Sequence, residues 1–335
     1  MADKEFKTVL ITGGAGYVGS ALVPMLLEND YNIKVYDLFI YGDVFNHLKN
    51  NKNISLIKAD IRNKEKMIEA TKDVDAIIHL ACISNDPSYE LNPELGKSIN
   101  YDAFFNIIEA AEINDVKRFI YASTSSVYGL KEEKNVRETA TCQPLTDYSK
   151  YKLECEHVLH DFGKENSIEY VVLRPATVCG YAPRLRLDLV VNILTINALM
   201  NKKIKIFGGS QLRPNINIKD IIEVYKLLLE APKNKINKET FNAGYQNLSV
   251  EEIAKSIRNT INDKDINFEH VPTDDIRSYH INSDKIKQML DFRPKYTVEE
   301  GVKTLVDAYK SGLIEDGLNN PLYYNIKMMQ QLDLK

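Results

Sequence analysis

A glycine-rich stretch near the N-terminus constrains the fold of this 335-residue chain more than any other feature. An apolar run typical of a buried strand, Thr8 to Thr12, ends directly at four glycines between positions 13 and 19. An amphipathic helical pattern follows and continues to about Asp30. Glycine lets the backbone leave a strand sharply and approach a phosphate, and a helix start offers free N–H groups and a positive dipole end. The stretch therefore predicts the first strand–turn–helix unit of a dinucleotide-binding fold.

The spacing is Gly13-x-x-Gly16-x-x-Gly19, with a first interval one residue wider than in the pattern G-x-G-x-x-G. A turn of this kind taken alone is also compatible with a purely structural role. The assignment therefore depends on motifs farther along the chain.

Apolar strands and amphipathic helices alternate through the first half of the chain, which predicts right-handed βαβ units and a parallel sheet. The segment 74–81 is almost entirely apolar, as expected of a parallel strand covered on both faces. We therefore expect a Rossmann-type, doubly wound α/β fold. Strands are expected at 8–12, 33–37, 53–61, 74–81, 116–123 and 170–174, and helices at 64–72, 100–114 and 148–166.

Beyond about residue 177 the alternation loosens, which suggests a second, smaller unit. We expect a dinucleotide-binding domain at 1–175 and a mixed α/β domain at 176–335. A segment at 214–244 is expected to return to the main sheet. Two helix-initiating capping boxes are predicted at 249–252 and 297–300.

The composition of the chain argues against several classes of function. Charged residues make up 27% of the chain and the net charge is −4, so no basic surface for nucleic acid is expected. The four cysteines form no C-x-x-C pair and no metal-like cluster with histidine, which predicts reduced thiols and no metal site. No apolar run approaches membrane-spanning length, and the first strand leaves no room for a signal peptide. We expect a cytoplasmic protein without a membrane partner.

Acidic and apolar residues at the predicted strand ends fit a dinucleotide. Asp37 closes the second strand, where a carboxylate can accept hydrogen bonds from the adenosine ribose and would repel a 2′-phosphate. No Lys or Arg follows until Lys49, so NAD is expected rather than NADP. Asp60 and Ile61 close the third strand near the expected adenine, and 80–81 closes the fourth near the expected nicotinamide ribose.

A second feature is Tyr148-Ser-Lys-Tyr-Lys152, in which a phenol and an ammonium share one helical face. An adjacent ammonium favours the phenolate and can make tyrosine a base near neutrality. Tyr323 and Lys327 repeat the spacing without a neighbouring strand or glycine turn, and we assign that pair to chance. Between the glycines and Tyr148, the segment 121–129 is rich in hydroxyls, which suit either a substrate alcohol or an ordinary capped turn.

Together these motifs resemble, in order and spacing, the extended short-chain dehydrogenases/reductases, in their NAD-dependent nucleotide-sugar epimerase/dehydratase branch. Later landmarks at Phe207-Gly, Arg213 to Asp220, Phe241-Asn-Ala-Gly244 and Asp291-Phe-Arg-Pro294 extend the resemblance over nearly the whole chain. The domain at 176–335 would then bind a nucleotide sugar.

The resemblance implies roles for individual residues. Tyr148 would be the general base, Lys152 would lower its pKa and bind the nicotinamide ribose, and Thr124 would hold the sugar hydroxyl. The cofactor NAD would be bound by Gly13, Gly16, Tyr17, Val18, Gly19, Asp37, Asp60, Ile61, Leu80, Ala81, Tyr148 and Lys152. Tyr17 and Val18 match backbone donors to the pyrophosphate. The substrate candidates are Ser84, Asn85, Ser125, Thr177, Asn192, Arg213 and Arg277, and Arg184 and Arg186 could add phosphate contacts.

Departures from the family pattern limit the reaction. The 4,6-dehydratases carry Asp-Glu after the catalytic Thr, whereas this chain has Ser125 and Ser126, so dehydration is not expected. The Asn that usually approaches the substrate phosphates is replaced by Thr177, so a UDP-hexose cannot be assumed. Arg213 remains available as a bidentate phosphate ligand.

The leading hypothesis is NAD-dependent oxidation of the C4 hydroxyl of a nucleotide sugar, with net 4-epimerisation, in the synthesis of surface polysaccharide precursors. An alternative is a net 4-dehydrogenase, for example on a GDP-linked hexose or heptose. A third is a non-catalytic NAD-binding sensor, which the intact Tyr148, Lys152 and Thr124 disfavour. The resemblance also implies a homodimer that pairs the helices at 100–114 and 148–166.

Overall fold

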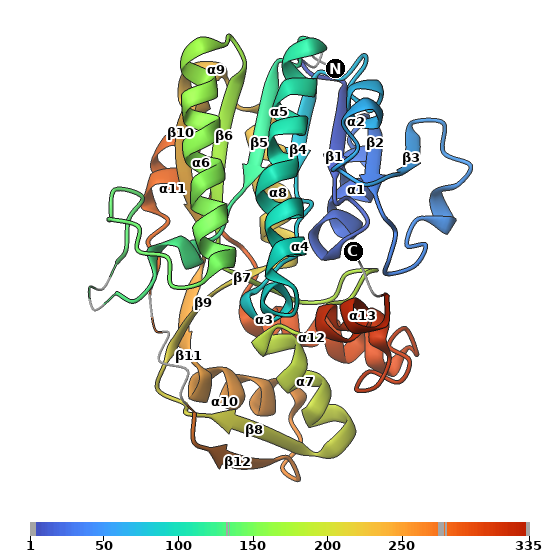
Figure 1. Ribbon diagram of the computed structural model, residues 1–335. Helices are drawn as coiled ribbons and strands as arrows, with labels where there is room; N and C mark the ends of the chain where they lie inside the picture. The colour runs from blue at the N-terminus through green and yellow to red at the C-terminus, as the bar shows by residue number, and fades with distance from the viewer. Residues whose placement is uncertain (1–4, 132, 134, 274–277, 279, 333–335) are drawn as a thin grey trace.

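A seven-stranded, entirely parallel sheet organises the molecule (Figure 1). The computed structural model describes residues 5–131, 133, 135–273, 278 and 280–332. The sheet order is β10-β6-β5-β4-β1-β2-β3. Its strands are β1 (Thr8–Thr12), β2 (Asn32–Asp37), β3 (Ile54–Lys58), β4 (Ala76–His79), β5 (Arg118–Ala122), β6 (Glu169–Pro175) and β10 (Glu239–Ala243). The predicted Rossmann-type α/β class is confirmed.

Helices cover both faces of this sheet because its strands are apolar on both sides. Val9 and Ile11 of β1 face one core cluster, whereas Leu10 between them faces the other. The first cluster is closed by α1 (Tyr17–Glu28) and α8 (Ile218–Glu230). The second is closed by α2 (Lys64–Ala70), α5 (Ala103–Ile113) and α6 (Asp147–Glu165).

The strand order reverses beside β1, which pairs with β2 on one side and with β4 on the other. The connections after these strands leave in opposite directions, and a crevice forms at the carboxyl ends between them. In open α/β sheets this switch point is where ligands bind. The fold therefore places its candidate site after β1 and β4.

A second lobe lies beyond the carboxyl edge (Figure 1). It contains two small sheets, formed by β7 (Thr177–Cys179), β9 (Leu212–Asn217) and β11 (Gln246–Ser249), and by β8 (Lys203–Phe207) and β12 (Asn267–Val271). Its helices are α7 (Val190–Asn201), α10 (Val250–Ile261) and α12 (Val298–Lys310). Both predicted capping boxes are present, with Ser249 beginning α10 and Thr297 beginning α12. The chain returns from this lobe through α8 to β10, which pairs with β6.

The sequence analysis did not predict several short helices and helical turns. The expected helix at 100–114 is preceded by α3 (Asp86–Glu90), α4 (Pro93–Lys97) and a π-helical turn (Ser98–Asp102), and α5 itself begins at Ala103. Asn85 and Asn92 each cap a short helix with a proline in its first turn, which explains the interruption. The remaining elements are α9 (Lys233–Ile236), α11 (Asp284–Leu290), α13 (Asn325–Leu332) and three 3₁₀ turns (Asn46–Leu48, Ser125–Tyr128 and Pro321–Tyr323).

Candidate active site

The carboxyl edge of the main sheet opens into a cavity of about 360 Å³. Its walls come from segments that directly follow β1 through β6. Every residue predicted to bind the cofactor or to take part in catalysis lines this cavity: Gly13, Gly16, Tyr17, Val18, Gly19, Asp37, Asp60, Ile61, Leu80, Ala81, Thr124, Tyr148 and Lys152. The structure thus brings residues from distant parts of the sequence into one site.

The glycine turn is shaped by close backbone approach. Gly13 has φ = 70°, and a Cβ there would lie 2.5 Å from the backbone nitrogen of Ala81. A Cβ on Gly19 would lie 2.3 Å from the carbonyl oxygen of Gly14, which packs the turn against α1. Gly16 caps α1 without a side-chain hydrogen bond. The first N–H groups of this 12-residue helix therefore face the cavity as an anion-binding end.

Asp37 at the end of β2 is held in place by backbone donors. Its Oδ2 accepts from the Ala15 N–H at 3.0 Å and its Oδ1 from the Phe39 N–H at 2.8 Å. Burial raises the pKa of this carboxyl, and these N–H groups oppose that effect. Asp60, in contrast, is paired with Arg62 at 2.7 Å, and although burial acts to raise the pKa of Asp60, Arg62 holds it below its usual range.

Tyr148 lies in the first turn of α6 and is enclosed by the cavity walls. Burial raises the pKa of its phenol well above the usual value, and the neighbouring Cys82 adds to this. Arg186 and the hydroxyl of Thr124 act in the opposite direction. Burial thus favours the neutral phenol, and further positive charge nearby would favour the phenolate that can act as a base.

Lys152 lies one turn later on the same helix face, as predicted. Its ammonium donates to the carbonyl oxygen of Ala122 at 2.8 Å and lies 5.1 Å from the centre of the Tyr121 ring. The side chain is buried and lines the cavity near the end of β5. Within the described residues its hydrogen-bond partner is this carbonyl and not the phenol of Tyr148.

The start of α6 is anchored by a capping box. Thr146 and Ser149 exchange side-chain and backbone hydrogen bonds, so Tyr148 sits inside a fully capped first turn. The Thr146 hydroxyl also donates to Asp86 at 2.6 Å, which joins α6 to α3. The position of the phenol is therefore set by both elements.

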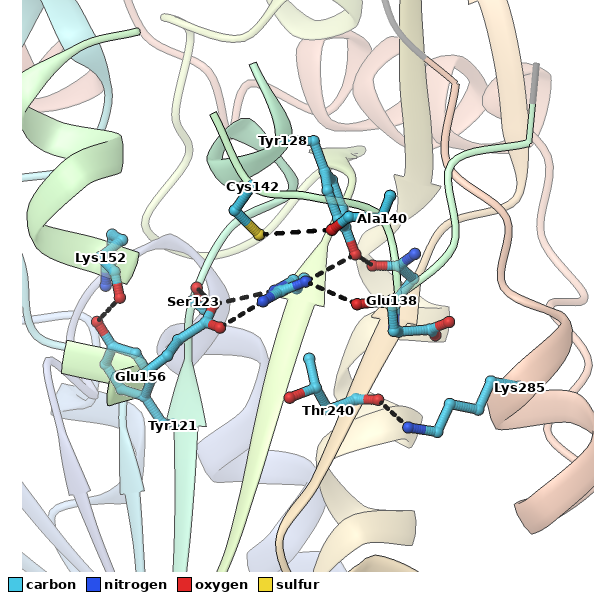
Figure 2. A network of polar contacts seen from close by, with 12 residues as sticks. Tyr121, Ser123, Tyr128, Glu138, Ala140, Cys142, Lys152, Glu156, Thr240 and Lys285 are labelled. Carbon is cyan, nitrogen blue, oxygen red and sulfur yellow. Dashed lines mark hydrogen bonds and ion pairs between the residues drawn. The ribbon is translucent and has the colours of Figure 1, made fainter. Parts of the chain in front are cut away.

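A buried polar network holds the far side of α6 (Figure 2). Glu156 accepts a bidentate pair of hydrogen bonds from Arg174 of β6, at 3.0 and 2.6 Å. It also accepts from the Ser123 hydroxyl, directly before Thr124 in the chain. The helix that carries Tyr148 and Lys152 is thus fixed to the ends of β5 and β6.

The same guanidinium extends the network toward β10 (Figure 2). Arg174 donates to the Tyr128 hydroxyl at 3.0 Å, and that hydroxyl donates to Asn242 at 2.7 Å. The backbone N–H of Asn242 in turn donates to Glu138 at 2.7 Å. The loop after β5 is thereby held against the last strand of the sheet.

The predicted substrate residues are placed unevenly. Ser84, Asn85, Ser125 and Thr177 line the main cavity. Asn85 also has φ = 79°, an unusual backbone conformation for a residue other than glycine. Arg213 lines a second cavity of about 460 Å³ in the second lobe, which shares Asn85 and Thr177 with the first. The two cavities also share Asp86, Ser126 and Leu189, and these five residues mark a path from one cavity to the other.

Two further residues were predicted to bind the substrate. Asn192 is fully buried, and its amide is used by Gly180, Tyr17 and the Arg186 carbonyl, so it supports the cavity wall instead of lining it. Arg277 lies outside the described residues. The Tyr323 and Lys327 side chains bond separate backbone groups, at Glu315 and Leu318, and do not line the cavity.

Sequence reasoning gave too little weight to the residues that cover the cavity from the second lobe. Arg184 and Arg186 both line it, as do Asn325 and Met329 of α13. Asn325 accepts from the Arg184 guanidinium at 2.5 Å although the two lie 141 residues apart in the chain. No local pattern marks such a contact, because it depends on how the chain end folds back.

The parallel sheet, the glycine turn at a helix start and the acid after β2 define a Rossmann-type dinucleotide-binding protein with a polar site for small-molecule chemistry. The model of the NAD dependent epimerase/dehydratase family matches residues 9–244. The chain belongs to this family, an enzyme family that is NAD-dependent, and its cofactor is NAD.

Individual relatives agree with this assignment. The chain is 31% identical to the uncharacterized UDP-glucose epimerase YtcB of Bacillus subtilis, over 92% of this chain and 99% of the relative. It is 28% identical to the dTDP-D-glucose 4,6-dehydratase of Bos taurus, over 92% and 90%. The UDP-glucose 4-epimerase structure from Thermotoga maritima superimposes with a TM-score of 0.80 at 28% identity, over 91% and 99%. The UDP-glucuronic acid 4-epimerase structure from Bacillus cereus, in complex with UDP-glucuronic acid and NAD, gives 0.82 at 27% over the same shares.

Proposed function

We propose that this protein oxidises the C4 hydroxyl of a nucleotide-activated sugar and then returns the hydride, with net 4-epimerisation. The observation that carries the proposal is the placement of Tyr148, Lys152 and Thr124 around one cavity at the switch point of the sheet. This arrangement offers a proton acceptor, a cation and a hydroxyl ligand to the same substrate alcohol.

The described residues fit NAD as a bound group. At Gly13 a Cβ would clash with the backbone of Ala81, so glycine lets the turn after β1 pack closely against the end of β4 beside the cavity. The N-terminus of α1 can bind the pyrophosphate, and Asp37 can accept from the adenosine ribose. Tyr17 and Val18 lie in the first turn of α1, where their N–H groups serve as the proposed donors. When bound, NAD supplies a hydride acceptor.

Tyr148 is the proposed base. The Tyr148 phenolate would take the proton as the O–H bond at C4 breaks and a C4 carbonyl forms, and bound NAD would supply the acceptor for the hydride that leaves C4. Thr124, which lies beside the phenol, would hold the hydroxyl in line. Positive charge from Lys152 and the oxidised nicotinamide would lower the raised pKa of the phenol, so that it ionises in the complete site.

The residues after Thr124 disfavour dehydration. Elimination of water needs a further acid and base near C5 and C6, whereas Ser125 and Ser126 line the cavity at these positions. Neither hydroxyl titrates near neutral pH. We therefore propose that 4,6-dehydration is not the reaction, although a dehydratase is among the relatives.

Substrate binding would use both cavities. Ser84, Asn85, Ser125 and Thr177 would contact the sugar, and Arg213 would bind the diphosphate as the nucleotide extends into the second cavity. These contacts, with the NAD-binding region at 1–175 and the nucleotide-sugar region at 176–335, are part of the proposal.

A net 4-dehydrogenase would use the same residues, and the replacement of the usual phosphate-binding Asn by Thr177 favours testing it. The two outcomes differ in whether the C4-keto sugar is reduced again before it leaves. The experiment follows reduced nicotinamide by near-ultraviolet absorbance while UDP-, GDP-, dTDP- and CDP-linked sugars are added singly, with product analysis of the same samples.

Conversion to a C4 epimer with little net NADH is the expected result. A lasting rise in NADH with a keto product would identify a 4-dehydrogenase instead and would name its nucleotide. Loss of activity without loss of biological function in Tyr148→Phe would favour the non-catalytic sensor. A 6-deoxy-4-keto product would contradict the exclusion of dehydration.

We propose that the product serves surface polysaccharide precursor synthesis in the cytoplasm and that the enzyme acts as a homodimer. Across the described ranges, no helix is long and apolar enough to span a bilayer. No group of three or more His, Cys, Asp or Glu side chains in the same residues could hold a metal ion.

A further inference from the structure

The guanidinium of Arg184 is buried without an ionic partner. The residue is 4% exposed, and its Nε is buried with no hydrogen bond. One terminal nitrogen donates to Asn325 at 2.5 Å, and the face of the Tyr41 ring lies 3.6 Å from the guanidinium carbon. No carboxylate among the described residues forms a salt bridge with it. A buried cation in this state is costly unless an anion completes its surroundings.

The neighbouring arginine shows the contrast. Arg186 approaches Asp188 at 3.4 Å and donates to the Ser84 carbonyl at 3.1 Å, so its charge is compensated within the protein. Asp37 and Asp188 affect Arg184 only through space. Of the two arginines that line the main cavity, Arg184 is the one that still needs an anion.

The backbone of Arg184 is docked on the phosphate-binding end of α1. Its N–H donates to the Ser20 hydroxyl at 3.1 Å, and Ser20 belongs to the first turns of that helix. A second bond, from the Tyr17 hydroxyl to the Gly180 carbonyl at 2.5 Å, fixes the start of the same loop. Arg184 therefore lines the same cavity as the glycine turn and the first residues of α1.

We propose that Arg184 binds the pyrophosphate of NAD, so that the second lobe and the α1 N-terminus both hold the cofactor. A guanidinium carries a full positive charge and can donate to phosphate oxygens, and Arg184 lines the cavity without a carboxylate partner among the described residues. The position near Asp37 and Tyr41 places it beside the adenosine half of the cofactor. A diphosphate of the sugar substrate is the competing anion, and Arg213 in the second cavity already suits that group.

The proposal gives α13 a function. Asn325 accepts from Arg184, and its amide donates to the Ser84 hydroxyl at 3.0 Å. The Asn325 N–H donates to Asp188 at 2.9 Å. An anion on Arg184 would thus stabilise the contact that keeps α13 over the cavity.

The test compares nucleotide-free wild type with Arg184→Met, which keeps an unbranched apolar side chain but removes the guanidinium and its charge. Equilibrium dialysis measures NAD, ADP-ribose and adenosine separately. We expect R184M to bind NAD and ADP-ribose about 10- to 100-fold more weakly, the range for losing a charge-assisted pair. Adenosine, which has no phosphate, should bind both proteins within about twofold. Arg293→Met, at an exposed arginine beside Asp291, is the matched control and should bind all three ligands as wild type does.

Thermal unfolding separates this role from a structural one. Without nucleotide, R184M should unfold at no lower temperature than wild type because an unpaired buried charge has been removed. With saturating NAD, the variant should gain less in unfolding temperature than wild type. A lower unfolding temperature combined with unchanged NAD affinity would overturn the proposal.

Two further results would also contradict it. An equal loss of adenosine binding would show that Arg184 supports the base or ribose. Unchanged ADP-ribose binding with weakened binding of nucleotide sugars would assign Arg184 to the substrate. Should R184M fail to fold, Arg184→Lys supplies the same test. Lysine keeps the positive charge but lacks the parallel N–H donors of the guanidinium, so we expect a loss of affinity confined to ligands that carry phosphate.

Discussion

Two opposite influences act on the ionisation of Tyr148. The rest of the site must balance them if the phenol is to act as a base near neutral pH. It is buried, which favours the neutral phenol, and it faces Thr124 and Arg186, which favour the anion. Lys152 adds a cation that is held on the Ala122 carbonyl one turn away. We infer that the ammonium is positioned before the cofactor arrives and that ionisation follows when the positive nicotinamide is added.

Replacing this phenol tests the chemistry without removing the ring. We expect Tyr148→Phe to lower kcat by about 10²- to 10⁴-fold, the usual contribution of a positioned acid or base. Binding of NAD and of the nucleotide sugar should change by less than about threefold, because the ring still fills its space. Steady-state kinetics and direct binding measurements check the two parts.

The chain supplies its own control at the second Tyr-x-x-x-Lys pair. Tyr323 accepts from the Glu315 N–H at 3.3 Å and lies outside the cavity lining. Tyr323→Phe should therefore leave kcat within about twofold. If both variants lost activity equally, the spacing would carry no chemical meaning and the assignment of Tyr148 as the base would fail.

His79 at the end of β4 should make stability depend on acidity. Its ring is completely buried and bonds the Thr12 hydroxyl at 2.6 Å, and burial lowers its pKa to about 3. The unfolded chain binds a proton near pH 6.5 and the folded chain does not. The folded state is therefore favoured above pH 6.5 and loses this advantage as the pH falls toward 3. Linkage predicts a loss of about 3 kcal/mol by pH 4.5.

Denaturant unfolding at pH 7.5 and pH 4.5 measures the effect. His79→Gln should show a smaller drop between the two values, because its amide does not titrate. His157→Gln, at an exposed position, should keep the wild-type drop. An unchanged pH dependence in H79Q would show that other groups cause the acid sensitivity.

At the scale of whole elements, a buried ion pair joins β5, β6 and α8. Arg118 is completely buried and contacts Glu169 at 2.6 Å. The same guanidinium donates to the Leu228, Leu229 and Ala231 carbonyls at the end of α8. One side chain thus pairs with a carboxylate and also donates hydrogen bonds to carbonyl groups at the end of α8, where a helix provides no donors of its own.

Removing one partner of this pair should be costly. We expect Glu169→Gln to reduce the free energy of unfolding by about 3 to 5 kcal/mol, because the guanidinium remains buried without its counter-charge. Glu109→Gln breaks the exposed pair with Lys64, also at 2.6 Å, and should cost under about 1 kcal/mol. Chemical denaturation of both variants gives the comparison, and similar losses would contradict the argument.

The elements of the sheet could be predicted because their signals are local. The run Thr8–Thr12 is apolar and ends in glycines, and β1 occupies those residues. In contrast, β9 contains Pro214 and only one isoleucine, so its sequence has no strand-like pattern. Its pairing with β7 and β11 depends on partners far along the chain. Local signals therefore predicted the main sheet and the starts of α10 and α12, but not how the small sheets of the second lobe pair.

The candidate site likewise contains residues that sequence motifs predict and residues that they do not. Asp37 and Tyr148 were found because family motifs fix their distance from the glycines and from one another. Arg184 and Asn325 meet only in the folded molecule, and no spacing rule anticipates them. Asn192 was expected to touch the substrate, yet burial commits its amide to Gly180 and Tyr17.

At the scale of the whole molecule, α5 and α6 lie in front of the sheet (Figure 1). On α5, Phe105 is 41% exposed and Ile113 is 55% exposed. Tyr101 packs edge-on against Phe105 and also contacts Tyr151 of α6, which extends the aromatic surface between the helices. Exposed apolar surface of this kind is typical of a protein interface.

We expect this surface to bury itself in a symmetric dimer, with α5 and α6 of two copies forming a four-helix contact. Light scattering after gel filtration should then give twice the chain mass of 38.3 kDa. Phe105→Glu should shift the protein to the monomer, because two copies of the charge would face each other across the interface. Leu313→Glu changes a leucine that is 59% exposed outside these helices and should leave the dimer intact. A monomeric wild type, or a dimer that survives F105E, would remove α5 from the interface, whereas dissociation by F105E and not by L313E would support α5 as part of it.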